Sequence, residues 1–240
     1  MPLLRVDPDL GNELERDELA QAQRVLVQVF EAPPGPWRPP GELAAGAGDL
    51  GLLVADGLLM RGVMIGATRC TELLGQGDVL RPWTMDASEH SSVPVSADWR
   101  IVDQPAQFAV INRSVGRRLG RWPQITAELF DRTIRRARWL SVQLAVCHTQ
   151  GIETRLLMVL WHFADRWGRV TPDGVVVDLK LSHRTLGQIV GARRPTVTSA
   201  LGRLSQSGRI SATKDGRWLL LGDPPELLLG DDQEVEDLGD

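Results

Sequence analysis

Apolar positions in the first half of the chain come in short runs, separated by glycine and by Asp-Gly pairs, between residues 41 and 112. Such runs predict many short β-strands, and Asp56-Gly57 between two of them predicts a hairpin turn. Strands at this spacing indicate an antiparallel sandwich or roll. Residues 17–30 begin with acids and continue with apolar positions three and four apart. They predict a short amphipathic helix that ends before Pro33.

A helical period begins at Pro123 and continues without glycine or proline as far as Gly151. One stripe repeats at three- and four-residue steps and consists of Ile125, Leu129, Arg132, Arg136, Leu140, Leu144 and Cys147. A solitary long helix between two domains often packs against a partner helix, so we expect homodimerisation through it, with burial in the core as the alternative. A second, nearly apolar helix is predicted over residues 152–167, followed by a strand at residues 175–177.

Two short helices and a hairpin are predicted over residues 181–221. Ser182 can cap a helix that Gly191 ends, and Pro195 suits the first turn of a second helix that Gly208 ends. Apolar runs on either side of residues 214–217 then form a hairpin that supplies a wing. This order of elements is a winged helix-turn-helix, which places its second helix in the major groove of DNA.

The two halves of the chain also differ in their charge. Residues 1–120 hold 11 basic and 16 acidic side chains, whereas residues 121–222 hold 16 basic and 7 acidic ones. Binding a polyanion through one domain requires such a basic half inside an acidic protein, although a solvated arginine-rich face is the alternative. Residues 223–240 hold 8 acidic and no basic side chains, and we expect them to form a disordered acidic tail.

The predicted second helix begins with arginines, which suit guanine edges or phosphates, and serine and threonine suit phosphates or a thymine methyl group. The candidate DNA-binding residues are Ser182, Arg184, Arg193, Arg194, Thr196, Thr198, Ser199 and Arg203. A winged helix can instead belong to a ligand-binding or scaffold protein and contact another protein. Residues 181–209 contain no Asp or Glu, which argues against that alternative.

Catalytic and metal-binding motifs are missing from the sequence. It has no Walker loop, no G-x-S-x-G elbow, no HExxH and no paired cysteine ligands. The two cysteines, Cys70 and Cys147, are far apart, and the four histidines show no metal spacing, so we expect no enzyme activity, no metal site and structural histidines. No apolar run reaches the roughly 18 residues of a membrane helix, and the N-terminus lacks a signal-peptide pattern. The expected location is the cytoplasm.

Residues 186–197, with the sequence LGQIVGARRPTV, resemble the helix-turn-helix of the Crp/Fnr superfamily, the cyclic-AMP receptor protein type. The resemblance covers about residues 40–222, because the order of segments is also that of the family. It implies an α+β fold in which residues 1–120 form an N-terminal helix and an antiparallel β-roll, a jelly-roll of the cyclic-nucleotide-binding type. A long dimerisation helix would follow at residues 121–150, and the winged helix-turn-helix at residues 151–222. The implied function is sequence-specific regulation of transcription by a homodimer on double-stranded DNA, with RNA polymerase as a further partner.

The resemblance also assigns roles within the second helix. In the family, the residue that matches Arg194 reads bases, and Ser182 and Arg193 fall at backbone-contact positions. Two further base-reading positions, usually Glu and Arg, hold Pro195 and Ser199 here. We therefore expect the operator to differ from the usual family sequence.

The predicted sensor departs from the family pattern. There, Gly77-Asp78 would lead into a cassette with a Gly-Glu pair for the ribose and an Arg-Ser pair for the cyclic phosphate. This chain has neither pair in residues 79–83 or 91–95. Cyclic AMP would leave polar groups unpaired, so we expect that it does not bind in the family manner.

Other side chains are candidates for a different ligand, and the protein can also be ligand-independent. They are Arg81 and Trp83, where the cassette should be, and Arg132, Arg135, Arg136 and Trp139 on the long helix. Arginine forks beside a stacking surface suit a nucleotide second messenger such as a cyclic dinucleotide. The alternative is that these arginines are solvated or ion-paired with the acidic N-terminal domain.

Overall fold

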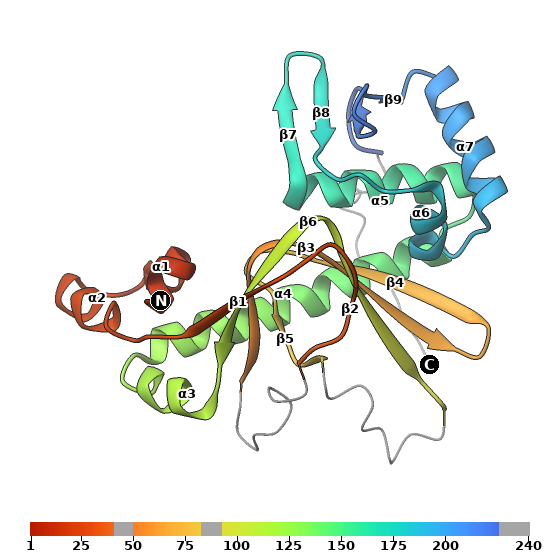
Figure 1. Cartoon of the computed structure of the whole chain (residues 1–240). Helices are drawn as coiled ribbons and strands as arrows, with labels where there is room; N and C mark the ends of the chain where they lie inside the picture. The colour runs from red at the N-terminus through yellow and green to blue at the C-terminus, as the bar shows by residue number, and fades with distance from the viewer. Residues whose placement is uncertain (41–49, 83–92, 226–240) are drawn as a thin grey trace, which may run out of the picture. The chain divides into compact units, whose positions relative to one another are not determined.

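The computed structural model describes residues 1–40, 50–82 and 93–225 (Figure 1). The chain divides into two compact units, Met1–Ser141 and Val142–Asp240. The division falls inside the long helix α4 (Pro123–His148), so residues 121–150 do not form a separate segment as the sequence predicts. Among the described residues, no helix combines the length and the apolar character needed to cross a membrane.

The first unit is built on an antiparallel sheet with the strand order β1-β6-β3-β4, in which β2 also pairs with β6 and β5 with β3. The strands are β1 (Gln28–Ala32), β2 (Gly35–Trp37), β3 (Gly51–Ile65), β4 (Thr68–Leu74), β5 (Val79–Leu80) and β6 (Ser96–Ile111). Three short helices, α1 (Leu3–Val6), α2 (Arg16–Ala22) and α3 (Arg113–Leu119), and the 3-10 helix η1 (Pro8–Gly11) complete the unit with the first part of α4. The predicted α+β fold with an antiparallel N-terminal sheet is confirmed.

The predicted hairpin turn at Asp56-Gly57 is wrong. Strand β3 runs through both residues to Ile65, and its pairing with β6 shifts register at this point. Gly57 has φ +94°, and a Cβ atom here would lie 2.7 Å from the Cα of Ala106. The glycine therefore serves a β-bulge and a close approach of two strands, and the chain reverses only after Ile65.

The predicted helix over residues 17–30 is also wrong in its second half. Helix α2 ends at Ala22, and residues Gln28–Ala32 form β1, which pairs with β6. Val25 and Val27 are buried and Leu26 between them is exposed, an alternation that fits an extended chain and not a helix. The pairing of Phe30 with Phe108, whose rings stack at 5.2 Å, favours the strand.

The first part of α4 belongs to the core of its own unit. Ile125 and Leu129 are buried in one apolar cluster with Leu3, Ile111 and Leu119. The beginning of the predicted stripe therefore packs against its own chain, which was the alternative to a partner helix. A second cluster lies around Phe108, whose ring stacks on that of Trp37 at 4.7 Å.

The second unit contains the predicted winged helix-turn-helix. Helix α5 (Ile152–Trp167) is followed by β7 (Gly168–Thr171), β8 (Gly174–Val177), α6 (His183–Val190), α7 (Arg194–Gln206), β9 (Ile210–Ala212) and β10 (Trp218–Leu220). The four strands form an antiparallel sheet in the order β7-β8-β10-β9. Helices α5, α6 and α7 contact one another through a buried apolar core. Every predicted helix and the wing hairpin are confirmed, and β7 is an addition.

Candidate nucleic-acid interface

Helix α6 begins and ends at the residues that the sequence predicted. The Ser182 side chain caps its N-terminus by accepting a hydrogen bond from the backbone N–H of Thr185 at 3.1 Å. Gly191 ends it in the left-handed conformation, with φ +66°. The guanidinium of Arg155 on α5 donates to the carbonyl of Val190 at 3.0 Å, which satisfies one of the last carbonyls of α6.

Helix α7 lies close to α6 because the residue at position 187 has no side chain. A Cβ atom on Gly187 would lie 2.5 Å from the carbonyl oxygen of Ala192, in the turn between the two helices. Pro195 lies in the first turn of α7, where no backbone N–H is needed. The inward face consists of the buried residues Val197, Ala200, Leu201 and Leu204, as predicted. These contacts fix which side chains of α7 point away from the protein.

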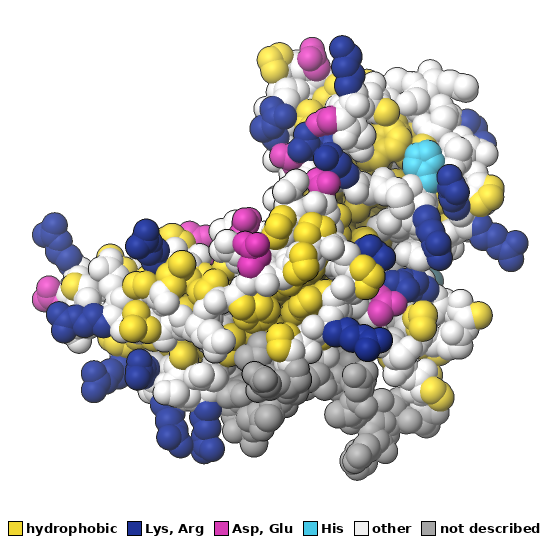
Figure 2. All heavy atoms as spheres, viewed as in Figure 1, with side chains coloured by type: hydrophobic (Ala, Val, Ile, Leu, Met, Phe, Trp, Pro, Cys, Tyr) yellow, Lys and Arg dark blue, Asp and Glu magenta, His cyan; other side chains and the backbone are white. Residues whose placement is uncertain are grey.

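The outward surface of α6 and α7 is basic. Arg184, Arg193, Arg194 and Thr196 are exposed, and none of the three arginines forms an ion pair with any residue that the structure describes. Figure 2 shows Lys and Arg side chains projecting from this part of the unit. We name Arg184, Arg193 and Arg194 the basic face. The structure thus brings these three predicted residues onto α6 and the start of α7, and none of them has a carboxylate partner among the described residues.

Three other predicted residues of α7 contact their own chain. The hydroxyl groups of Thr198 and Ser199 donate to the carbonyls of Arg194 and Pro195, four residues earlier, at 3.0 and 3.2 Å. The guanidinium of Arg203 donates to the carboxylate of Glu153 on α5 at 2.5 Å, and both side chains are about half exposed. Arg203 therefore carries a compensated charge, unlike the basic face.

The wing is the turn between β9 and β10. The Thr213 hydroxyl accepts from the N–H of Arg217 at 2.9 Å, and Gly216 has φ +82°. Arg217 pairs with Asp178 at 2.6 Å and with Asp215. Hydrogen bonding from Thr213 and the charge of Arg217 lower the pKa of the Asp215 carboxyl. Lys214 is exposed and has no carboxylate partner in the described ranges, so it is the wing's available cation.

His183 is a residue of this surface for which the sequence predicted only a structural role. It is the first residue of α6, and its Nδ1 lies 2.9 Å from the hydroxyl of Thr198 on α7. Its ring lies 6.2 Å from that of Trp218 at the base of the wing. Its place directly after the Ser182 cap was the one signal in the sequence that could have identified it.

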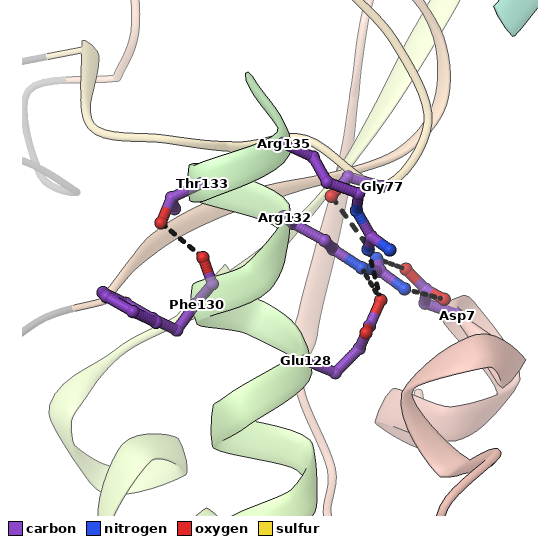
Figure 3. Close-up of polar contacts among 7 residues, drawn as sticks. All are labelled: Asp7, Gly77, Glu128, Phe130, Arg132, Thr133 and Arg135. Carbon is purple, nitrogen blue, oxygen red and sulfur yellow. Dashed lines mark hydrogen bonds and ion pairs between the residues drawn. The ribbon is translucent and has the colours of Figure 1, made fainter. Parts of the chain in front are cut away.

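The arginines of α4 that were candidates for ligand binding have partners inside the first unit. Arg132 is buried and pairs with both carboxylate oxygens of Asp7, with Glu128 at 2.9 Å and with the carbonyl of Gly77 at 3.3 Å (Figure 3). Although burial lowers the pKa of the Arg132 guanidinium, its bonds to Asp7 and Glu128 raise it overall. Arg135 is exposed and pairs with Glu128 at 2.6 Å.

Arg136 shares a buried carboxylate with a strand residue. It donates twice to Glu72, at 2.6 and 3.0 Å, and Arg61 on β3 contacts the same carboxylate at 2.6 Å. Burial lowers the pKa of Arg61, despite Glu72. Arg81 donates to the carbonyl of Leu50 at 3.0 Å. Trp139 is half-buried, and Trp83 lies outside the described residues.

The arginines considered for a ligand phosphate already have partners in the described part of the first unit. Arg132 and Arg136 pair with carboxylates, and Arg81 donates to a backbone carbonyl. This arrangement corresponds to the ion-pairing alternative of the sequence analysis. Residues 83–92, which include part of the expected cassette, are not described.

Comparison with known proteins finds a family match within the second unit. Residues 154–228 match the family of the Crp-like helix-turn-helix domain. The global nitrogen regulator of Synechocystis sp. is 41% identical over 61 residues, which cover 25% of this chain and 27% of that protein. The regulatory protein CysR of Synechococcus elongatus is 28% identical over 86 residues, or 35% of this chain and 42% of that one. The match spans about a quarter to two fifths of these relatives.

Solved structures share the fold over most of the chain. A mutant of CooA from Carboxydothermus hydrogenoformans has a TM-score of 0.65 and 16% identity, covering 93% of this chain and 94% of that chain. A CRP/FNR-family transcriptional regulator of Thermus thermophilus has a TM-score of 0.54 and 19% identity, covering 81% and 94%. The c-di-GMP-responsive global regulator CLP of Xanthomonas campestris has a TM-score of 0.58 and 16% identity, covering 82% and 95%.

Proposed function

We propose that this chain, which carries a Crp-like helix-turn-helix domain and has the fold of Crp/Fnr-family regulators, binds double-stranded DNA sequence-specifically as a homodimer and regulates transcription. The observation that carries the proposal is the basic face, three exposed arginines without carboxylate partners among the described residues of a domain matched to this family. In a helix-turn-helix, the second helix enters the major groove and the first crosses the DNA backbone. Helix α7 is that second helix.

The two arginines at the start of α7 are suited to contact different parts of DNA. Arg194 is its first residue and is suited to the paired acceptors of a guanine edge, whereas Arg193 precedes it and is suited to a phosphate. Ser182 caps α6, where the backbone of DNA would pass. Pro195 cannot donate or accept through its side chain, so the operator differs from one that is read by a polar residue at that position.

Homodimerisation would use a face of α4 that the predicted stripe only partly includes. Phe130 and Leu144 are exposed to 63% and 61%, and Ala137 lies halfway between them in the sequence and is also exposed. These residues repeat at seven-residue steps, which is the spacing of a coiled-coil seam. Large apolar side chains left in water favour an interface, so this face is the one proposed to meet a second copy of α4.

Regulation would come from a ligand other than cyclic AMP or would require none. A cyclic dinucleotide is the first ligand to test, since a regulator of the same fold is described as c-di-GMP responsive. A ligand that binds the folded state raises the melting temperature by mass action, so a thermal-shift screen of cyclic mono- and dinucleotides tests this part. RNA polymerase is the further partner that a transcription regulator of this type would contact.

The decisive experiment is binding to the protein's own promoter region at low salt, measured by electrophoretic mobility shift with and without the cyclic nucleotides. Phosphate contacts release counterions, so affinity should fall steeply as salt rises. Failure to shift this DNA at low salt under every condition would contradict the proposal. A binding partner that stays bound at high salt through an apolar contact would favour the protein-interaction alternative.

A further inference from the structure

The hydrogen bonds around His183 favour one assignment of its two ring nitrogens. The Thr198 hydroxyl donates its single hydrogen to the carbonyl of Arg194 at 3.0 Å. In this arrangement the hydroxyl accepts from His183, whose Nδ1 lies 2.9 Å away and then carries the ring hydrogen. Nε2 is then the ring nitrogen that faces a ligand rather than Thr198.

The groups around this imidazole are basic or neutral. Its own helix supplies Arg184, α7 supplies Thr198 and the start of the basic face at Arg194, and β10 supplies the indole of Trp218. The wing next to Trp218 carries Arg217, whose charge is compensated by Asp178 and Asp215. No carboxylate lies within ion-pair distance of His183 in the described part of the chain. No acidic side chain of the described protein is therefore placed to stabilise a charged imidazole.

A DNA phosphate would supply that missing negative charge. His183 is the first residue of the helix that crosses the backbone in a helix-turn-helix, between Ser182 and Arg184, which are both exposed. We propose that His183 is a protonation-dependent phosphate contact: Nε2 takes one proton from solvent and donates it in a hydrogen bond to a DNA phosphate oxygen. This inference rests on the proposed DNA-binding function and adds a pH response to it.

The proposal predicts a specific pH dependence. Because histidine changes charge between pH 5 and 8, the protein should bind its DNA about tenfold more tightly near pH 6 than near pH 8, the effect of one charge-assisted hydrogen bond. One additional neutralised phosphate should also steepen the plot of log affinity against log salt by about 0.9 at the lower pH. Fluorescence anisotropy with the full chain and labelled promoter DNA measures both quantities at fixed ionic strength.

Two substitutions separate the titrating nitrogen from the structural bond to Thr198. In His183→Asn, the amide N–H can replace Nδ1 as the donor to Thr198, but nothing replaces Nε2. In His183→Gln, the longer amide reaches the position of Nε2 without being able to take a charge. Both variants are expected to lose the pH difference in affinity and in salt slope. A melting curve recorded for each variant shows whether the domain is folded.

The measurements distinguish a failure of the His183 proposal from a failure of the proposed DNA binding. Salt-dependent DNA binding by the wild type that is equally strong near pH 6 and pH 8 would overturn the role of His183 and leave the proposed function intact. The same pH difference in a folded His183→Asn variant would also overturn it, because another group would then be titrating. Absence of DNA binding at both pH values would contradict the proposed function itself.

Discussion

Arg193 and Arg194 are neighbours in the sequence and both are exposed, yet the structure gives them different places. Arg193 is the N-cap of α7, outside the helix, and Arg194 is its first residue. A side chain on the first turn of a recognition helix reaches base edges, whereas one before the helix lies nearer the DNA backbone. The two residues should therefore respond differently to the same substitution.

Arg194→Ala is expected to weaken binding to the best operator by about 1–3 kcal/mol and to relax base preference at one position, because a bidentate base contact is lost. Arg193→Ala should weaken binding to all DNA sequences alike and lower the salt slope by about 1. Binding to a panel of operators with single-base changes, at several salt concentrations, measures both effects. Arg169→Ala on β7, an exposed arginine outside the helix-turn-helix, is the control. Unchanged operator affinity in both test variants would show that α7 does not read DNA through these residues.

Single residues were predictable where the signal is local. Ser182, Gly191 and Pro195 act on the backbone within one helical turn, so their roles follow from the sequence alone. Asp56-Gly57 carries an equally clear signal, but positive φ at a glycine serves a bulge as well as a turn. Only the pairing of β3 with β6 distinguishes the two, and that pairing joins residues about fifty positions apart.

At the scale of elements, α4 shows what a periodic pattern can and cannot predict. Its length and its start at Pro123 follow from the absence of glycine and proline. The predicted stripe included Arg132, but the period could not show that Asp7, 125 residues earlier, compensates its charge. Helix α5, whose buried residues are apolar apart from His162, was predicted with both of its boundaries.

Asp7→Asn is expected to lower the free energy of unfolding by about 3 kcal/mol, because it leaves the buried guanidinium of Arg132 with Glu128 as its one remaining carboxylate. Urea denaturation at one fixed protein concentration measures the loss, since an oligomer's stability depends on concentration. Glu153→Gln, which breaks the exposed pair with Arg203, is the matched control and should cost less than about 1 kcal/mol. Equal losses of unfolding free energy in the two variants would show that the buried pair does not stabilise the packing of the N-terminal segment.

Phe130→Asp and Leu144→Asp are each expected to shift the protein from dimer to monomer, because they place a charge on the proposed coiled-coil face of α4. Thr133→Asp also introduces a charge at an exposed position of α4, and its oligomeric state shows whether a charge outside the seven-residue repeat disrupts the dimer as well. Sedimentation equilibrium gives the oligomeric state, and a melting curve confirms folding. Dimers of wild-type strength in both apolar-site variants would exclude this face as the interface.

At the scale of the whole chain, charge is distributed by segment, so a basic segment was predictable from counting alone. The second half was expected to carry the polyanion site, and the three arginines of the basic face lack carboxylate partners in the described structure. Arginines 132 and 136 contributed to the same count, yet they are neutralised in the first unit by Asp7 and Glu72. Net charge thus identifies a basic segment, and only three-dimensional contacts show which of its charges are available.

The segment 226–240 makes the net charge of the chain more negative, because it holds seven acidic and no basic side chains. It follows the winged helix in the sequence. DNA approaching α7 meets the summed field of the chain, so removing seven negative charges should speed association about threefold to tenfold at low salt and have little effect at high salt. Stopped-flow association rates of the chain truncated after Pro225 measure the effect. A full-length variant with Asn and Gln in place of the seven acids separates charge from length and should match the truncation. If truncation accelerates association while the neutral variant does not, the segment acts by its bulk and the electrostatic argument is wrong.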